Sequence, residues 1–116
     1  MAATGTGKRD YKGFTPRMGV YAVRHLPSGR TLLGSSLHLQ GILNRHRFQL
    51  ETGVHAQQAM QADWRRDGRD AFAFEILDEL KPLPDRPDHD PSSDLAELEA
   101  LWRERLGLTP QTTYAR

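Results

Sequence analysis

The sequence of 116 residues contains no cysteine, which excludes a disulfide framework, a thiolate metal site and a cysteine nucleophile. It also has no apolar run approaching the roughly 20 residues that are needed to cross a bilayer. Residues 1–12 lack the apolar stretch of a signal peptide. We therefore expect no membrane association and a cytoplasmic location.

The net charge of +1 conceals a strong asymmetry along the chain. Residues 1–69 contain eleven Lys or Arg against four Asp or Glu, whereas residues 70–116 contain five against eleven. An excess of positive charge is typical of proteins that bind a polyanion such as nucleic acid. The acidic half indicates either solubility or carboxylates for a metal ion. The alternative is that both sets of charges only cover a solvated surface.

Hydrophobic periodicity and turn residues divide the chain into six elements. Ser36 is a candidate N-cap for the first helix, and Ser93 or Asp94 for the last. The expected elements are strands 20–26 and 30–33, helices 37–51 and 57–66, strand 72–80 and helix 95–106. This β-β-α-α-β-α order predicts an α+β domain, with a small three-stranded antiparallel sheet flanked by helices.

Two segments fall outside this pattern. Residues 1–13 are small, polar and basic, so we expect a disordered tail. Residues 82–94 contain four prolines and four aspartates, a composition that cannot build a core, so we predict a loop. A single domain is therefore expected over residues 14–116, with that loop inside it.

Short motifs occur in a characteristic order along these elements. Gly19-Val20-Tyr21 opens the first strand, Leu32-Leu33-Gly34 lies in the second, and His46 lies on the first helix. Glu99 lies three residues before Trp102 on the last helix. The ordered set resembles the GIY-YIG nuclease family from about residue 18 to residue 114. This resemblance implies metal-assisted phosphodiester hydrolysis with Mg²⁺ or Mn²⁺, and single- or double-stranded DNA as the partner.

The resemblance also implies roles for three residues. Tyr21 occupies the place of the family's GIY tyrosine, which acts on the attacking water, and His46 the place of a histidine that bonds the tyrosine or the phosphate. Glu99 would be the metal ligand. Glu97 is its competitor, but it is about 200° around the helix and points more to water. For Tyr21 and His46, the alternatives are a packed strand aromatic and a solvent-facing histidine.

Three positions depart from the family pattern. Leu32 stands where the family has its YIG tyrosine, Ile42 where it has its catalytic arginine, and Ala115 where an asparagine is often found. Arg45, one helical turn after Ile42, is the candidate replacement for the arginine. Three functions remain open. They are a DNA endonuclease with a rearranged site, a DNA-binding module whose catalytic set has degenerated, and an unrelated small α+β interaction domain, against which the charge asymmetry and the ordered motifs argue.

Further side chains are candidates for contact with DNA. We expect Trp64 to be a core residue more readily than a base-stacking residue, and the sequence suggests no partner for His55 or His89. A homodimer would let one basic face bind each strand. The predicted nucleic-acid-binding residues are Arg24, Arg30, His38, Arg47, Arg65 and Arg66.

Overall fold

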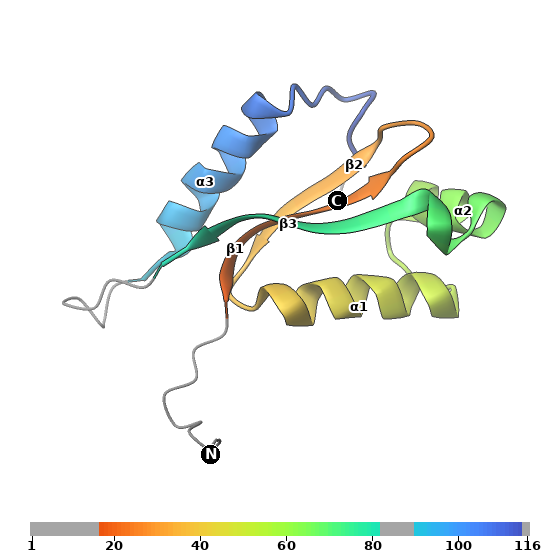
Figure 1. Cartoon of the computed structure of the whole chain (residues 1–116), viewed down its shortest axis with the longest axis horizontal. Coiled ribbons are helices and arrows are strands. Elements are labelled where there is room, and N and C mark those ends of the chain that lie inside the picture. The colour runs from red at the N-terminus through yellow and green to blue at the C-terminus, as the bar shows by residue number, and fades with distance from the viewer. Residues whose placement is uncertain (1–16, 82–89, 115–116) are drawn as a thin grey trace, which may run out of the picture.

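The computed structural model describes residues 17–81 and 90–114 (Figure 1). The predicted basic tail, residues 82–89 and Ala115 lie outside these ranges. The elements are β1 (Met18–His25), β2 (Thr31–Ser36), α1 (Leu39–Thr52), α2 (Gln58–Asp67), a 3₁₀ turn (Arg69–Ala71), β3 (Phe72–Leu80) and α3 (Ser92–Arg105). The predicted order and the α+β class with a three-stranded antiparallel sheet are confirmed.

The strands form one sheet in the order β2-β1-β3, with both pairs antiparallel. Register shifts between Val20 and Tyr21, where Leu77 is the extra residue on β3. Beside this bulge, a Cβ added at Gly19 would lie 2.0 Å from the carbonyl oxygen of Asp78. The first glycine of the motif therefore permits close backbone approach at the irregularity.

Helices cover both faces of the sheet, with α1 and α2 on one side and α3 on the other (Figure 1). The alternation of side chains along β1 explains the two cores, because Tyr21 and Val23 point to α1 while Val20 and Ala22 point to α3. The larger core contains Tyr21, Val23, Leu32, Leu39, Leu43, Leu50, Met60, Phe72 and Tyr114. Trp64 packs against it, as predicted for a core residue.

The second strand is longer than predicted. We expected residues 34–36 to end the hairpin, but Gly34 pairs with Tyr21, Ser35 with Val20, and the ladder continues to Ser36. The prediction that Ser36 caps the first helix is also wrong. Its Oγ accepts a hydrogen bond from the backbone N–H of His38 at 3.0 Å, and the helix begins one residue later.

The last helix begins at Ser92, so residues 92–94 are helical and the predicted loop is shorter at that end. Pro91 occupies the N-cap position, where its missing N–H costs nothing, and Asp90 Oδ1 accepts from the N–H and the hydroxyl of Ser92. On this helix Leu101 is exposed. Leu98 and Trp102 do pack against the sheet.

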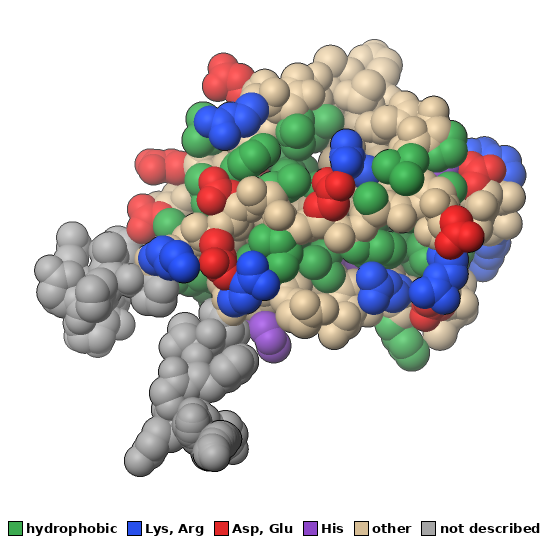
Figure 2. Space-filling model, in the orientation of Figure 1, with side chains coloured by type: hydrophobic (Ala, Val, Ile, Leu, Met, Phe, Trp, Pro, Cys, Tyr) green, Lys and Arg blue, Asp and Glu red, His purple; other side chains and the backbone are tan. Residues whose placement is uncertain are grey.

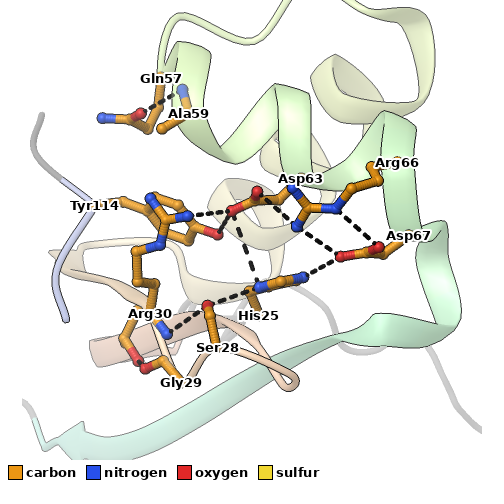
Figure 3. Close-up of polar contacts among 11 residues, drawn as sticks. His25, Ser28, Gly29, Arg30, Gln57, Ala59, Asp63, Arg66, Asp67 and Tyr114 are labelled. Atoms are coloured by element: carbon orange, nitrogen blue, oxygen red, sulfur yellow. Dashed lines mark hydrogen bonds and ion pairs between the residues drawn. The ribbon is translucent and has the colours of Figure 1, made fainter. Parts of the chain in front are cut away.

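A polar network ties the β1–β2 turn, α2 and the C-terminal segment together (Figure 3). Asp63 is buried at its centre, where it accepts a hydrogen bond from the Tyr114 hydroxyl and pairs with Arg30 at 3.3 Å and Arg66 at 3.0 Å. Desolvation beside this carboxylate raises the pKa of Tyr114. A parallel bridge from Thr31 to Thr113 completes the attachment of the C-terminal segment, so Tyr114 does not hold it alone.

Charges of both signs are interspersed over the face shown in Figure 2, although their balance changes along the sequence. Hydrophobic side chains lie between them on this face. Within residues 17–81 and 90–114, no helix has the length and apolarity of a membrane span.

Candidate active site

Tyr21 lies on the α1 face of β1, directly over Gly34 of the neighbouring strand. A Cβ added at Gly34 would lie 2.6 Å from the Tyr21 oxygen and 2.7 Å from its Cζ. The glycine of the second motif therefore clears the space in which the tyrosine of the first motif lies. Tyr21 is only 3% exposed, and its hydroxyl lies 3.0 Å from Nε2 of His46 on α1.

A hydrogen-bonded chain continues from His46 to His55. Nδ1 of His46 lies 2.8 Å from Nε2 of His55, and the backbone N–H of Gln57 donates to Nδ1 of His55 at 2.9 Å. Because a backbone amide can only donate, neutral His55 must carry its proton on Nε2 and donate it to His46. Neutral His46 then carries its proton on its own Nε2. The chain thus directs an N–H donor at the oxygen of Tyr21.

Local structure explains why His55 lies there. Helix α1 ends at Gly53, and the chain turns back so that His55 stacks on His46 with ring centroids 5.1 Å apart. The buried side-chain amide of Gln61 accepts from the backbone N–H of His55 and donates to the backbone carbonyl of Leu50, each at 3.0 Å. Burial lowers the pKa of His55, which favours the neutral form that the hydrogen-bond chain requires.

The lowered pKa of His55 predicts a pH dependence of stability. The unfolded chain takes up a proton near the ordinary value of 6.5, whereas folded His55 resists protonation until the pH is lower. Between these two pKa values the unfolded state binds more protons, so stability falls as the pH drops through this window. Urea unfolding at several pH values should show a steeper loss in the wild type than in His55→Gln. Equal slopes would contradict the assignment.

Glu99 lies on α3, on the opposite face of the sheet from Tyr21. Its Oε1 accepts from the hydroxyl of Ser35 at 3.0 Å, and its Oε2 pairs with Arg103 at 3.1 Å. The side chain is 15% exposed, whereas Glu97 is an exposed residue, as the helical geometry predicted. Glu99 therefore borders the sheet, and its competitor faces water.

Tyr21 and Glu99 approach consecutive residues of the same strand. The tyrosine lies over Gly34, and the carboxylate of Glu99 accepts from Ser35. Consecutive residues of a strand face opposite sides of the sheet, so the two groups approach β2 from opposite faces. Because β2 is an edge strand, a substrate at its outer edge can reach both faces. Among the described residues, the only bridge along that edge is Thr31–Thr113, at the other end of the strand.

The donor set fits a hard divalent cation in one respect. Glu99 supplies one carboxylate, with the Ser35 hydroxyl beside it, and Mg²⁺ commonly binds one or two carboxylates and retains several waters. Within the described part of the chain there is no cluster of three or more His, Asp or Glu that could hold a metal. A cation at Glu99 would therefore depend on water and substrate oxygens for its remaining ligands.

The predicted arginine replacement lies on the same side of α1 as the residue it would replace. Ile42, Arg45 and His46 all line one pocket of about 630 Å³, which Leu32 also lines. Arg45 makes no hydrogen bond or ion pair with the described residues, so its guanidinium is available to a ligand. Arg47 does not line this pocket.

The predicted DNA-contacting residues differ in their surroundings. Arg24 pairs with Glu75 at 2.7 Å, and Arg65 donates to the carbonyl of Gly53 at 3.1 Å. Both side chains are thus already engaged by other groups. His38 is exposed beside the N-terminus of α1.

The remaining arginines are also engaged. Arg30 and Arg66 both pair with Asp63, and Arg66 with Asp67 in addition, which lowers the pKa of Asp67 to about 2. Arg47 lies over the ring of Phe74, 4.7 Å from its centroid. Binding of DNA at these positions stays a prediction, and Arg45 is the cation whose surroundings fit it best.

Three residues around the candidate site escaped the sequence analysis. His55 follows His46 by nine positions, and only the turn at Gly53 brings the rings together. Ser35 lies in a segment that was predicted to end the hairpin, although its hydroxyl donates a hydrogen bond to Glu99. Of the three, only the contact of Arg103 could have been predicted from the sequence, because Arg103 follows Glu99 by four residues on one helix.

A methyl group at Gly34 should displace Tyr21. The Gly34→Ala variant is expected to lose about 1–3 kcal/mol of stability, because the added Cβ overlaps a ring held by His46. The cost should largely disappear in a Tyr21→Ala background, a comparison that chemical denaturation of the four proteins makes directly. An unchanged cost in that background would mean that the tyrosine does not lie over the glycine.

Comparison with known proteins adds evidence on the fold. No family model and no curated protein sequence matches the chain. The catalytic domain of the homing endonuclease I-TevI superposes with a TM-score of 0.64 and 22% identity, covering 85% of this chain and 99% of that one. A mutant of the catalytic domain of intron endonuclease I-TevI gives 0.64 and 20%, covering 85% and 92%. The chain therefore has the fold of the GIY-YIG endonuclease catalytic domain.

Proposed function

We propose that the protein is a metal-dependent DNA endonuclease that hydrolyses phosphodiester bonds at the edge of β2. The observation that carries the proposal is the placement of Tyr21 and Glu99 on consecutive residues of that edge strand, with a hydrogen-bond chain behind the tyrosine. A packed aromatic residue and a surface carboxylate would not require this arrangement. The likeness to a homing endonuclease catalytic domain supports DNA as the substrate.

The hydrogen bonds that link Tyr21, His46 and His55 determine what the tyrosine can do. A phenol titrates near 10 and is a weak base at neutral pH. The phenol oxygen of Tyr21 accepts the N–H of His46, so its own O–H proton is donated on the side away from His46. Tyr21 would therefore orient the attacking water as a phenol, and only its phenolate form would accept the proton of that water. His55 acts only through His46 and is a positioning residue.

Two further groups would complete the site. A divalent cation held by Glu99 would supply charge stabilisation for the phosphate and the leaving oxygen. Arg45 would bind a phosphate oxygen, because a guanidinium is permanently charged and matches phosphate geometry. Its position beside Ile42 makes it the substitute for the arginine that the family pattern places there.

One observation favours a second function, DNA binding without catalysis. Leu32 and Ile42 place apolar carbon where the family has a tyrosine and an arginine, and losing one preorganised donor commonly costs 10²–10³ in rate. The fold and exposed cations such as Arg45 would then serve binding alone. The presence of Tyr21, His46 and Glu99 together favours the enzyme.

Nicking of supercoiled plasmid distinguishes the two functions. The purified protein is incubated with Mg²⁺, with Mn²⁺ and with EDTA, and DNA binding is titrated on the same preparations at several salt concentrations. Metal-dependent nicking is expected, with Arg45→Ala slower than Arg47→Ala. Salt-sensitive binding without nicking would support the binding module. Neither binding nor nicking would overturn both functions.

The role of His55 has its own test. His55→Leu should lower kcat by about 10- to 100-fold, the range found for partners that orient a functional group, and leave KM unchanged. The acid limb of the pH–rate profile should move to higher pH, because Tyr21 loses the N–H directed at its oxygen. His55→Gln should restore most activity, since an amide can accept from Gln57 and donate to His46. A purely structural role predicts no movement of the pH profile.

A further inference from the structure

The pocket beside His46 has a chemistry that the proposed hydrolysis does not use. It has a volume of about 630 Å³ and is lined by Leu32 and Ile42 together with Ala56. We call it the Leu32–Ile42 pocket. These three side chains form the apolar wall of the pocket, with Leu32 the most buried of them. None of the three has a polar atom, so the wall can offer only apolar contact.

A phosphate or a metal ion is a poor occupant for this wall. Moving a charged group from water onto leucine and isoleucine carbon costs solvation that those side chains cannot replace. The carboxylate that fits a cation, Glu99, lies on the other face of the sheet. The single cation among the lining residues is Arg45, which is exposed. A ligand with an uncharged apolar body attached to an anionic group matches this distribution.

The polar lining carries groups that both donate and accept hydrogen bonds. Gln49, Gln57 and Gln58 present three amides around the pocket, and His55 contributes an imidazole edge. Gln57 is fixed at the N-terminus of α2, because its Oε1 accepts from the N–H of Ala59 at 2.9 Å. Nucleobases have apolar faces and edges that donate and accept, which is the complement of such a lining.

We infer that the Leu32–Ile42 pocket receives one unpaired nucleobase of the DNA, while Arg45 holds the adjoining phosphate. This inference rests on the proposed function and names its substrate class: DNA with an unpaired nucleotide beside the scissile bond. A base within a continuous duplex has its faces covered by its neighbours, and extruding it costs a few kcal/mol. An unpaired base avoids most of this cost. Leu32 and Ile42 are then specificity-determining residues.

Three oligonucleotide duplexes of equal length test the inference without cleavage, in buffer that contains EDTA. One is fully paired, the second carries one extra unpaired adenosine, and the third carries an abasic nucleotide in its place. We expect the second to bind about tenfold more tightly than the first, and the third to lose most of that gain. A 2-aminopurine at the unpaired position should change its fluorescence on binding.

Filling the pocket should remove this preference. Ile42→Trp and Ala56→Trp are expected to bind the bulged and paired duplexes within twofold of each other. Ala62→Trp, on an exposed position of α2 outside the pocket, is the matched control and should keep the tenfold preference. Thermal unfolding identifies any variant that does not fold, and Ala56 is exposed, so its substitution spares the core.

Each outcome is decisive. Equal affinity of wild-type protein for bulged and paired DNA overturns the inference, as does a preference that survives the abasic substitution or both filled pockets. In those cases paired DNA is still bound, and the endonuclease proposal stands. Failure to bind any of the three duplexes, with no plasmid nicking, overturns the proposed function and this inference together.

Discussion

Replacing Glu99 by glutamine is expected to lower the rate of metal-dependent DNA nicking by about 100- to 1000-fold, the effect of removing one charge-stabilising group from an active site. The amide retains an oxygen that can accept from Ser35, so the contact between α3 and β2 should persist. What the variant loses is the negative charge that would hold a divalent cation. Initial rates of plasmid nicking at several Mg²⁺ and Mn²⁺ concentrations measure the effect.

Glu97→Gln is the matched control, because it removes the same charge from an exposed position of the same helix. Its nicking rate should stay within about twofold of the wild type. DNA binding in EDTA should be unaltered or slightly tighter in Glu99→Gln, since a carboxylate near the phosphates has been neutralised. Full activity of Glu99→Gln would remove the carboxylate from the mechanism.

The largest expected loss of stability follows from Asp63→Ala. Asp63 is buried, with its side chain 3% exposed, and it pairs with Arg30 and Arg66 and accepts from Tyr114 (Figure 3). Removing it leaves the Tyr114 hydroxyl buried without this acceptor and separates the C-terminal segment from α2. Because Arg30 and Arg66 are partly exposed and keep their contact with water, the cost comes mainly from the buried Tyr114 hydroxyl and the lost charged hydrogen bonds. A loss of about 2–4 kcal/mol is expected, which urea denaturation would measure.

Asp63→Asn separates charge from hydrogen bonding, because the amide oxygen can still accept from Tyr114. Its loss of stability should be smaller than that of Asp63→Ala. Asp70→Ala is the surface control, since Asp70 is exposed, and a change within about 0.5 kcal/mol is expected. A loss in Asp63→Ala no larger than in this control would show that the network does not contribute to folding.

The sequence by itself determined the order of the elements. Alternating apolar residues predicted β3 at the observed bounds, Phe72–Leu80. Alternation of apolar residues at every second position is typical of a strand and does not fit a helix. The first helix ends close to the predicted position, because Gly53 adopts the left-handed conformation that ends helices. Helical geometry alone separated Glu99 from Glu97 and placed Arg45 beside Ile42, since both comparisons depend only on residues within one helix.

Only the tertiary structure decided how these residues meet. The contacts of Tyr21 with Gly34 and His46, and of Glu99 with Ser35, join positions that are distant in sequence, and local periodicity has no information about such pairs. His55 became part of the candidate site because a turn and the amide of Gln61 return it to α1. The ends of β2 and α3 were likewise set by strand pairing and by Asp90, which outweighed the local turn and cap preferences.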